Sequence, residues 1–285
     1  MSELRTPDGA FSWRRRRVLI TGGSSGIGKQ LAADLLRRGA QVGIVAQHQD
    51  KLRAAELELR HISQDVWSYA CDVAILDQVR AMARAYRERF DAPEVVINNA
   101  GYAVYYTFEQ MPAEEIHRLF DVNLTGAALV TRELLPDMIR TGGGRVVMMA
   151  SIAGRIPMTP CSVYSASKHG LVALAELLRV ETDRFNIKVH VVCPGRVETE
   201  FFSHPSFKTR THRPETSRTI PVEAVSRAVI DAVERNRFMT YVPRHFGLLA
   251  WLAAAMPLVF RPLWHRFLSA RVESVYSGAA TTKVK

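Results

Sequence analysis

Short apolar runs alternate along this chain with longer segments of helical periodicity, and this alternation restricts the possible folds more than any other feature. Six runs have the length and composition of buried strands, at residues 18–20, 42–46, 66–70, 95–98, 145–150 and 188–193. Helical spacing is found around residues 27–36 and over 77–89, 123–139, 162–183 and 221–235. The alternation predicts an α/β fold of Rossmann type, with a doubly wound, mostly parallel sheet and helices on both faces.

The expected organisation is one catalytic domain over residues 14–245, because no linker or internal repeat divides this stretch. Residues 1–13 precede it as an N-terminal extension, and residues 246–285 follow it as an apolar segment and a tail. Within the domain, residues 203–219 are polar, interrupted by proline, and rich in His and Arg. A loop of this length in a compact domain predicts a substrate lid.

The cysteines and the net charge restrict the compartment and the partners. Cys71, Cys161 and Cys193 match neither a disulfide framework nor a zinc site, so we expect no metal and a reducing, cytoplasmic compartment. The formal charge of +10 favours anionic ligands or a membrane surface. No usual nucleic-acid-binding motif accompanies this charge, so we expect no nucleic-acid partner.

A glycine-rich loop follows the first strand and opens the first helix. In it, Gly22 permits a tight turn, Gly26 lets the backbone approach a pyrophosphate, and Gly28 allows close packing. The helix N-terminus then presents free N–H groups to the phosphates. The loop lacks the Lys-Ser/Thr pair of a P-loop, so a dinucleotide is favoured over a nucleoside triphosphate.

The end of the second strand bears on the choice between NAD and NADP. An NAD site usually places an acid there for the ribose 2′-OH, but this chain has Gln47 and His48. Together with Ser25, these side chains can hydrogen-bond a 2′-phosphate. The arginine of a strong NADP site is also missing, so NADP(H) is favoured while NAD(H) stays open. Asp50 follows and is expected to cap the next helix.

Tyr164 and Lys168 are four residues apart in a helical segment and therefore share one face. The pKa of a free tyrosine is about 10, and a nearby ammonium and an oxidised nicotinamide both favour the phenolate. Ser151 follows the strand at 145–150, at the sheet edge where open α/β sheets bind ligands. The three residues predict general acid–base chemistry at a substrate oxygen held by Ser151 and Tyr164.

With these residues, the chain resembles the short-chain dehydrogenase/reductase family in its classical type over roughly residues 17–200. Residues 21–28 are similar to its T-G-x-x-x-G-x-G loop, and residues 98–101 to its N-N-A-G motif. Asp72 and Val73 are similar to the adenine-contacting position after the third strand. Residues 194–195, with Val197 and Thr199, are similar to the P-G motif near the nicotinamide.

The resemblance implies the roles of the site residues. Tyr164 exchanges a proton with the substrate oxygen, which Ser151 orients. Lys168 binds the nicotinamide ribose and lowers the pKa of Tyr164, and Asn123 holds a water that links Lys168 to solvent. The expected cofactor-binding set is Gly22, Ser24, Ser25, Gly26, Ile27, Gly28, Gln47, His48, Asp72, Val73, Asn99, Ala100, Gly101, Tyr164, Lys168, Pro194, Gly195, Val197 and Thr199. The resemblance also implies a seven-stranded parallel sheet, and a homodimer or homotetramer formed through the helices that begin near Asn123 and Ser162.

The expected substrate side consists of residues 102–108, 152–158 and 201–219, where apolar and aromatic side chains favour a hydrophobic substrate. An equally good interpretation is that these side chains pack the lid onto the domain. The segment 247–260 is uncharged, is interrupted by Pro257 and has basic residues on both sides. Residues 246–266 are therefore expected to lie at a membrane surface, to cover the substrate pocket or to join an oligomer.

Three functions are compatible with these patterns. The favoured one is an oxidoreductase that moves a hydride between NADP(H) and a carbonyl or alcohol of a lipid-like or steroid-like substrate. The second is an NAD-dependent dehydrogenase of a small polar alcohol. The third, a non-catalytic dinucleotide sensor, is disfavoured because Tyr164 and Lys168 are both present.

Overall fold

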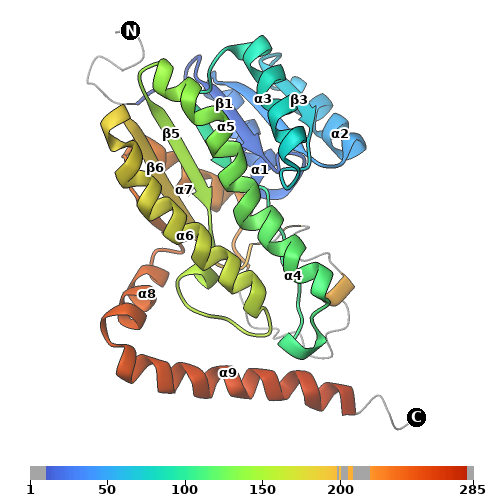
Figure 1. Ribbon diagram of the computed structural model, residues 1–285, viewed down its shortest axis with the longest axis vertical. Coiled ribbons are helices and arrows are strands. Elements are labelled where there is room, and N and C mark those ends of the chain that lie inside the picture. The colour runs from blue at the N-terminus through green and yellow to red at the C-terminus, as the bar shows by residue number, and fades with distance from the viewer. Residues whose placement is uncertain (1–10, 198, 200–204, 208–218, 281–285) are drawn as a thin grey trace.

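The computed structural model describes residues 11–197, 199, 205–207 and 219–280 and has a parallel, seven-stranded sheet at its centre (Figure 1). The strand order is β3-β2-β1-β4-β5-β6-β7. The strands are β1 (Arg17–Thr21), β2 (Gln41–Ala46), β3 (Val66–Ala70), β4 (Val95–Asn98), β5 (Gly144–Met149), β6 (Ile187–Pro194) and β7 (Met239–Val242). The predicted Rossmann-type fold and all six predicted strands are confirmed.

Helices cover both faces of the sheet. They are α1 (Gly26–Arg37), α2 (Gln49–Arg60), α3 (Leu76–Phe90), α4 (Ala113–Phe120), α5 (Gly126–Arg140), α6 (Ser162–Thr182), α7 (Val222–Glu234), α8 (Phe246–Ala255) and α9 (Pro257–Ala280). One core contains the buried faces of α1, α2 and α7, and the other contains those of α3, α5 and α6. In Figure 1, α5 and α6 lie in front of the sheet and α7 lies behind it.

The central strands β1, β2 and β4 are mainly apolar and buried because parallel strands covered on both faces have no side that faces water. Val18 pairs in register with Val42 on one side and with Val95 on the other, and all three side chains are fully buried. The strand order reverses direction between β1 and β4. Such a switch point leaves a crevice at the carboxyl ends of the strands, where open α/β sheets bind ligands.

Four elements and one cap differ from the sequence expectations. The pattern revealed neither β7 nor α4, and the apolar segment and tail at 246–285, for which no helix was predicted, contain α8 and α9. Asp50 was expected to cap α2, and this is wrong: His48 occupies the cap position, and Asp50 lies in the first turn of the helix. There its negative charge faces the positive end of the helix dipole, which explains why an acid is favourable at this position.

The described end of the expected N-terminal extension packs against the domain. Trp13 is buried and donates from Nε1 to Glu234 Oε1 of α7 at 2.8 Å. The Phe11 ring lies 4.4 Å from the Arg145 guanidinium carbon and 4.8 Å from that of Arg16. Residues 1–10 lie outside the described residues, and the predicted domain boundaries stay predictions.

Helices α8 and α9 leave the sheet and run along one end of the molecule, at the bottom of Figure 1. No single described helix combines the length and apolar character that crossing a membrane requires. The pair formed by α8 and residues 257–270 of α9 satisfies that test only jointly, and the two helices meet at a bend of 119°. Pro257, at the expected interruption, begins the second helix.

Candidate active site

Four neighbouring strands bring the expected site residues to one edge of the sheet. The glycine loop follows β1, residues 99–101 follow β4, Ser151 follows β5, and Gly195 follows the end of β6. Because β1, β4, β5 and β6 are consecutive in the sheet, these loops lie side by side. The fold therefore gathers segments that are far apart in the sequence.

The glycine loop has backbone conformations and contacts that exclude larger residues. Gly22 and Gly26 have φ values of +66° and +51°, in the left-handed region that favours glycine. A Cβ on Gly28 would lie 2.1 Å from the carbonyl oxygen of Gly22. The Ser25 side chain makes no capping bond, and the first turn of α1 contains no acid.

Polar side chains from β1 and the segment after β4 brace this loop. Asn99 donates from Nδ2 to the carbonyl oxygens of Thr21 and Gly22, each at 3.1 Å. Thr21 Oγ1 accepts from the main-chain N–H groups of Asn99 and Ala100, each at 3.0 Å. Asn98 instead supports the sheet, since its Nδ2 donates to Thr131 Oγ1 at 2.8 Å.

The residues expected at the adenosine end form a second group beside β2. Gln47 donates from Nε2 to Asp72 Oδ2 at 3.2 Å, and Arg118 of α4 forms an ion pair with the same oxygen at 2.6 Å. Asp72 is buried, and its charge is balanced by the guanidinium of Arg118. His48 is exposed at the start of α2. The carboxylate in contact with Gln47 is therefore already paired.

Ser151 and Tyr164 meet at the end of β5. Their side chains are hydrogen-bonded, and this bond favours the phenolate of Tyr164. Ser151 is held by two further bonds: its Oγ accepts from Ala153 N at 3.1 Å and donates to Pro194 O at 3.4 Å. Burial, the larger effect, raises the pKa of Tyr164 above its usual value of 10.0.

Lys168 lies one turn further along α6 and is buried, with its side chain 3% exposed. Its Nζ donates to the carbonyl oxygen of Met149 at 2.9 Å and lies 5.9 Å from the centre of the Tyr164 ring. Burial lowers the pKa of Lys168 from 10.5 to about 8. The pKa of Tyr164 responds to burial and to its hydrogen bond with Ser151. The expected lowering of this pKa by Lys168 stays a prediction.

Asn123 is buried in the π-helical turn Asp121–Thr125 between α4 and α5, a type of irregularity that is frequent at functional sites. Its Oδ1 accepts from Tyr102 N at 2.9 Å, and its Nδ2 donates to Tyr102 O at 2.9 Å. A Cβ on Gly101 would lie 2.9 Å from Asn123 Oδ1 and 3.3 Å from Lys168 Nζ. Asn123 and Lys168 therefore approach each other around Gly101.

The remaining expected cofactor residues surround the same edge. The N–H of Gly195 donates to Val242 O at 2.8 Å, Val197 is buried and pairs with Ile220, and Thr199 lies next to Gly26. Val73 packs against Gly126 at the start of α5. Ser24 and Ile27 are partly exposed in the glycine loop and at the start of α1.

The expected substrate side is only partly described. Ile156 is buried at 1% exposure, so it packs the loop instead of offering a free surface. Tyr102 donates from its hydroxyl to Glu115 Oε2 at 2.8 Å, and Tyr105 stacks obliquely on Phe207. Phe201, Phe202 and, except for residues 205–207 and 219, the expected lid at 203–219 lie outside the described residues.

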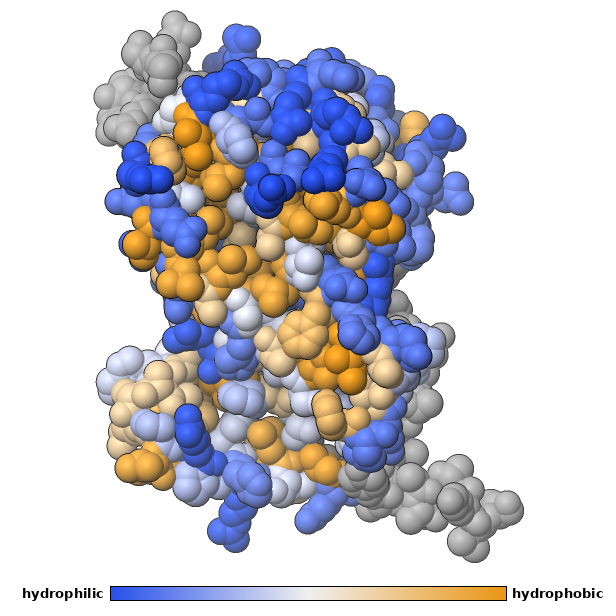
Figure 2. All heavy atoms as spheres, viewed as in Figure 1, coloured by the Kyte–Doolittle hydropathy of each residue, from blue (hydrophilic) through white to orange (hydrophobic). Residues whose placement is uncertain are grey.

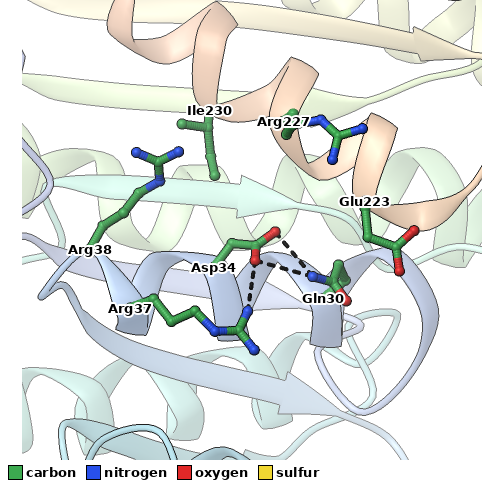
Figure 3. A pocket seen from close by; sticks show the side chains of 7 residues that line it. All are labelled: Gln30, Asp34, Arg37, Arg38, Glu223, Arg227 and Ile230. Carbon is green, nitrogen blue, oxygen red and sulfur yellow. Dashed lines mark hydrogen bonds and ion pairs between the residues drawn. The ribbon is translucent and has the colours of Figure 1, made fainter.

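A surface hollow between α1 and α7 is separate from this group (Figure 3). Asp34 in its wall accepts from Gln30 and from Arg37, as the dashed lines in Figure 3 show. Ser226 of α7 donates to the same carboxylate at 2.7 Å. None of the expected site residues lines this hollow, and its carboxylate is already bonded.

Two contributions to the site had no sequence signal. Arg118 lies in α4, which the pattern did not reveal, and its partner Asp72 is 46 residues away. The bond from Lys168 to the Met149 carbonyl joins α6 to β5, and such main-chain contacts leave no trace in the sequence. Thr21 was part of the glycine motif, but its bracing role appears only in the structure.

The glycine loop gives a test of whether a dinucleotide fits this edge. The Gly22 carbonyl packs directly against Gly28, no side chain projects from Gly26, and the first turn of α1 contains no acid beside its free N–H groups. Such an arrangement accepts a pyrophosphate. Tyr164 and Lys168 of α6 lie at the same edge of the sheet, where Tyr164 is bonded to Ser151 and Lys168 to the carbonyl oxygen of Met149.

Comparisons with known proteins agree with this geometry. Residues 16–208 match the family model described as short chain dehydrogenase. The chain is 32% identical over 228 residues to 3-ketodihydrosphingosine reductase of Bos taurus, covering 77% of this chain and 69% of the relative. An actinorhodin polyketide ketoreductase solved with NADPH is 29% identical with a TM-score of 0.73, covering 85% of this chain and 99% of that chain.

A short chain dehydrogenase/reductase from Burkholderia phymatum, solved with NAD, has the same fold with a TM-score of 0.79 at 22% identity. The match covers 87% of this chain and 96% of that chain. The chain therefore belongs to the short chain dehydrogenase family. It is an oxidoreductase that acts on carbonyl or alcohol groups with a nicotinamide dinucleotide.

Proposed function

We propose that the protein is an NADP(H)-dependent reductase of a hydrophobic ketone, or the dehydrogenase of the matching alcohol. The observation that carries this proposal is the meeting of Ser151 and Tyr164 at the end of β5, with Lys168 one turn along the same helix face. A phenol bonded to a fixed hydroxyl can exchange a proton with a substrate oxygen that both groups contact.

In reduction, Tyr164 donates its proton to the carbonyl oxygen, and Ser151 orients that oxygen and steadies its developing charge. The ammonium of Lys168 lies close to Tyr164. Together with Asn123, which lies beside it at Gly101, Lys168 would bind the nicotinamide ribose. The bound nicotinamide supplies or takes up the hydride. In oxidation, the phenolate of Tyr164 accepts the alcohol proton.

The preference for NADP(H) is supported by the charges beside β2. No acid stands at the end of this strand, and the neighbouring Asp72 is paired with Arg118 at 2.6 Å. A 2′-phosphate therefore meets no free carboxylate at Gln47. The exposed His48 side chain and the Ser25 hydroxyl, which makes no capping bond to α1, can hydrogen-bond the 2′-phosphate. The NADPH complex of the polyketide ketoreductase is consistent with this choice.

A hydrophobic substrate is supported by aromatic side chains near the site and by the relatives. The main chain of Tyr102 is bonded to Asn123, and Tyr105 and Tyr106 follow in the same segment after β4. Two relatives are named 3-ketodihydrosphingosine reductase, from Bos taurus, and 3-dehydrosphinganine reductase, from Danio rerio. The substrate class proposed here is accordingly a ketone on a long aliphatic chain or a fused ring.

A homodimer or homotetramer belongs to the same proposal. Figure 2 shows hydrophobic side chains gathered over α5 and α6. On α6, Leu177 and Val180 are 65% and 75% exposed. Pairing of α5 and α6 with those of a second copy would remove this apolar surface from water.

The test is a panel of ketones and alcohols assayed with each cofactor by nicotinamide absorbance. The panel contains long-chain keto-lipids, steroid ketones and small polar carbonyls. We expect turnover of the apolar members with NADPH and at least about tenfold lower kcat/KM with NADH. Turnover restricted to small polar alcohols with NAD would contradict the proposal and favour the second function considered above.

A further inference from the structure

We propose that α8 and α9 form a docking element for the interfacial region of an anionic phospholipid bilayer. The surface consists of large apolar side chains that these two helices expose, here called the C-terminal ridge: Leu248, Trp251, Met256, Leu258, Val259, Leu263 and Phe267. The docking itself does not depend on the proposed reaction.

The exposure of the C-terminal ridge is unusual for a water-facing surface. Leu258 is 89% exposed, Leu263 66%, Leu248 62% and Trp251 59%. Monomeric proteins seldom leave contiguous apolar groups of this size in water unless the surface binds something. Figure 2 shows hydrophobic side chains over α8 and α9, with hydrophilic ones projecting from the outer edge.

The sequence of α9 arranges this surface as a stripe. Val259, Leu263 and Phe267 follow one another at intervals of four residues, so they lie along one side of the helix. Trp264 is partly buried and stacks on Phe260 and on Phe267 of the same helix, at ring distances of 5.5 and 5.0 Å. The stripe is therefore exposed, and the Phe267 ring at its end is packed against Trp264.

The positive charge of α9 and of the residues before α8 indicates which kind of partner the C-terminal ridge binds. From residue 235 to residue 272 the sequence contains no Asp or Glu, whereas it contains Arg235, Arg237, Arg244, Arg261, Arg266 and Arg271. Arg244, Arg261 and Arg266 are exposed. An apolar segment whose charged residues between 235 and 272 are all cations complements lipid headgroups with negative charge and the acyl chains beneath them. Trp251, exposed among these residues, suits the interfacial depth where tryptophan is enriched.

The shape of the pair indicates a segment that lies on the membrane. The bend of 119° between α8 and α9 prevents the two helices from forming one straight span. A ridge with exposed cations on the same helices instead inserts to the depth of the headgroup and acyl boundary.

The ridge is also connected to the candidate active site. Trp264 donates from Nε1 to the carbonyl oxygen of Pro157 at 2.8 Å, in the loop that follows Ser151. Docking of the ridge thus brings the expected substrate side close to the bilayer. In the part of this inference that rests on the proposed function, the substrate is a ketone that reaches the site from the lipid phase.

The first experiment is co-sedimentation of the full chain with vesicles of phosphatidylcholine alone or with about 30% phosphatidylglycerol. We expect binding to the anionic vesicles that weakens as salt is raised. Leu263→Glu/Phe267→Glu is expected to lower the partition at least about tenfold, and Arg261→Gln/Arg266→Gln several-fold. Leu57→Glu, at an apolar side chain 64% exposed on α2, is the matched control and is expected to bind as the unchanged chain does.

Failure of the unchanged chain to bind anionic vesicles, or equal binding by Leu263→Glu/Phe267→Glu, overturns the proposal. A shift of that variant to a smaller species in sedimentation velocity, without a change in vesicle binding, assigns the ridge to a second copy and also overturns it. Dinucleotide binding and thermal unfolding of each variant show that the fold is retained.

The link to the active site has its own measurement. With a long-chain ketone embedded in anionic vesicles, the ridge variant is expected to lose at least about tenfold in turnover, while turnover of a detergent-solubilised short-chain ketone stays unchanged. Equal loss with both substrates contradicts the link. If the unchanged chain turns over neither ketone, the proposed function fails, whereas vesicle co-sedimentation still decides the docking.

Discussion

The Nζ atom of Lys168 lies 5.9 Å from the centre of the Tyr164 ring, and both side chains project from one face of α6 into the edge of the sheet. Burial acts on the two groups in opposite directions. It raises the pKa of Tyr164 and lowers the pKa of Lys168, because it disfavours the charged form of each. A bound ligand that favours the charged forms would therefore lower the pKa of Tyr164 and raise the pKa of Lys168.

The lowered pKa of Lys168 makes stability depend on pH. Because its pKa is about 8 in the folded chain and 10.5 ordinarily, the unfolded chain binds more protons between these values. The free energy of unfolding is thus expected to rise between about pH 8 and about pH 10, by about 2 kcal/mol more than in Lys168→Met. Urea denaturation at several pH values, without dinucleotide, measures this. Identical pH profiles for the two proteins would contradict the buried ammonium.

A methyl group at Gly28 is expected to disturb the glycine loop. The Cβ of Gly28→Ala would lie 2.1 Å from the Gly22 carbonyl oxygen, so the loop must move. We expect dinucleotide affinity to fall at least about tenfold in a fluorescence titration. Gly170→Ala is the control, since its Cβ meets the end of the flexible Leu124 side chain at 2.9 Å. Equal affinity in both variants would place the phosphates elsewhere.

A carboxylate at the end of β2 is expected to change cofactor preference. His48→Asp puts a negative charge at an exposed cap position beside the expected 2′-phosphate. We predict that the Kd for NADP(H) rises at least about tenfold while the Kd for NAD(H) stays the same or falls. Asp50→Asn, two residues further on, controls for changes in the charge of α2. A parallel change for the two cofactors would remove His48 from the phosphate site.

Tyr86 carries a buried hydroxyl for which the described residues supply no hydrogen-bond partner. Tyr86→Phe removes that group and keeps the ring packing against Trp67 and Phe90. The free energy of unfolding is expected to rise by about 1 kcal/mol. Tyr69→Phe, at a partly exposed ring stacked on Trp67, is expected to change it by less than about 0.5 kcal/mol. A loss of stability in Tyr86→Phe would show that the hydroxyl has a partner.

The sequence was most informative where burial is continuous. Five of the six predicted strands are mainly buried because both faces of the sheet are covered there, whereas the edge strand β3 is mostly half-buried and was predicted from its β-branched and aromatic residues. In β7 most side chains are only partly buried, so no such run marks it. Helix α4 buries only Leu119 completely, which leaves little periodic signal. The interruption at Pro257 was visible in the sequence, but the bend of 119° between the helices on its two sides was not.

The site was predictable to the extent that its residues belong to local motifs. The glycine loop and the Tyr164–Lys168 pair each lie within a few residues, and the strand ends of an α/β sheet determine where they point. The ion pair between Arg118 and Asp72 joins segments whose proximity depends on the packing of α4. The π-helical turn that holds Asn123 likewise depends on tertiary contacts with Tyr102 and Ser167.

The most direct test of the account compares turnover and dinucleotide binding in Tyr164→Phe, using a ketone that the unchanged enzyme reduces. Removing the hydroxyl leaves the ring and Lys168 in place but takes away the proton that Tyr164 exchanges. We predict a loss of about 10²- to 10⁴-fold in kcat with an unchanged Kd for the dinucleotide. A Tyr164→Phe enzyme that retains the kcat of the unchanged protein would contradict the assignment of Tyr164 as the acid–base group.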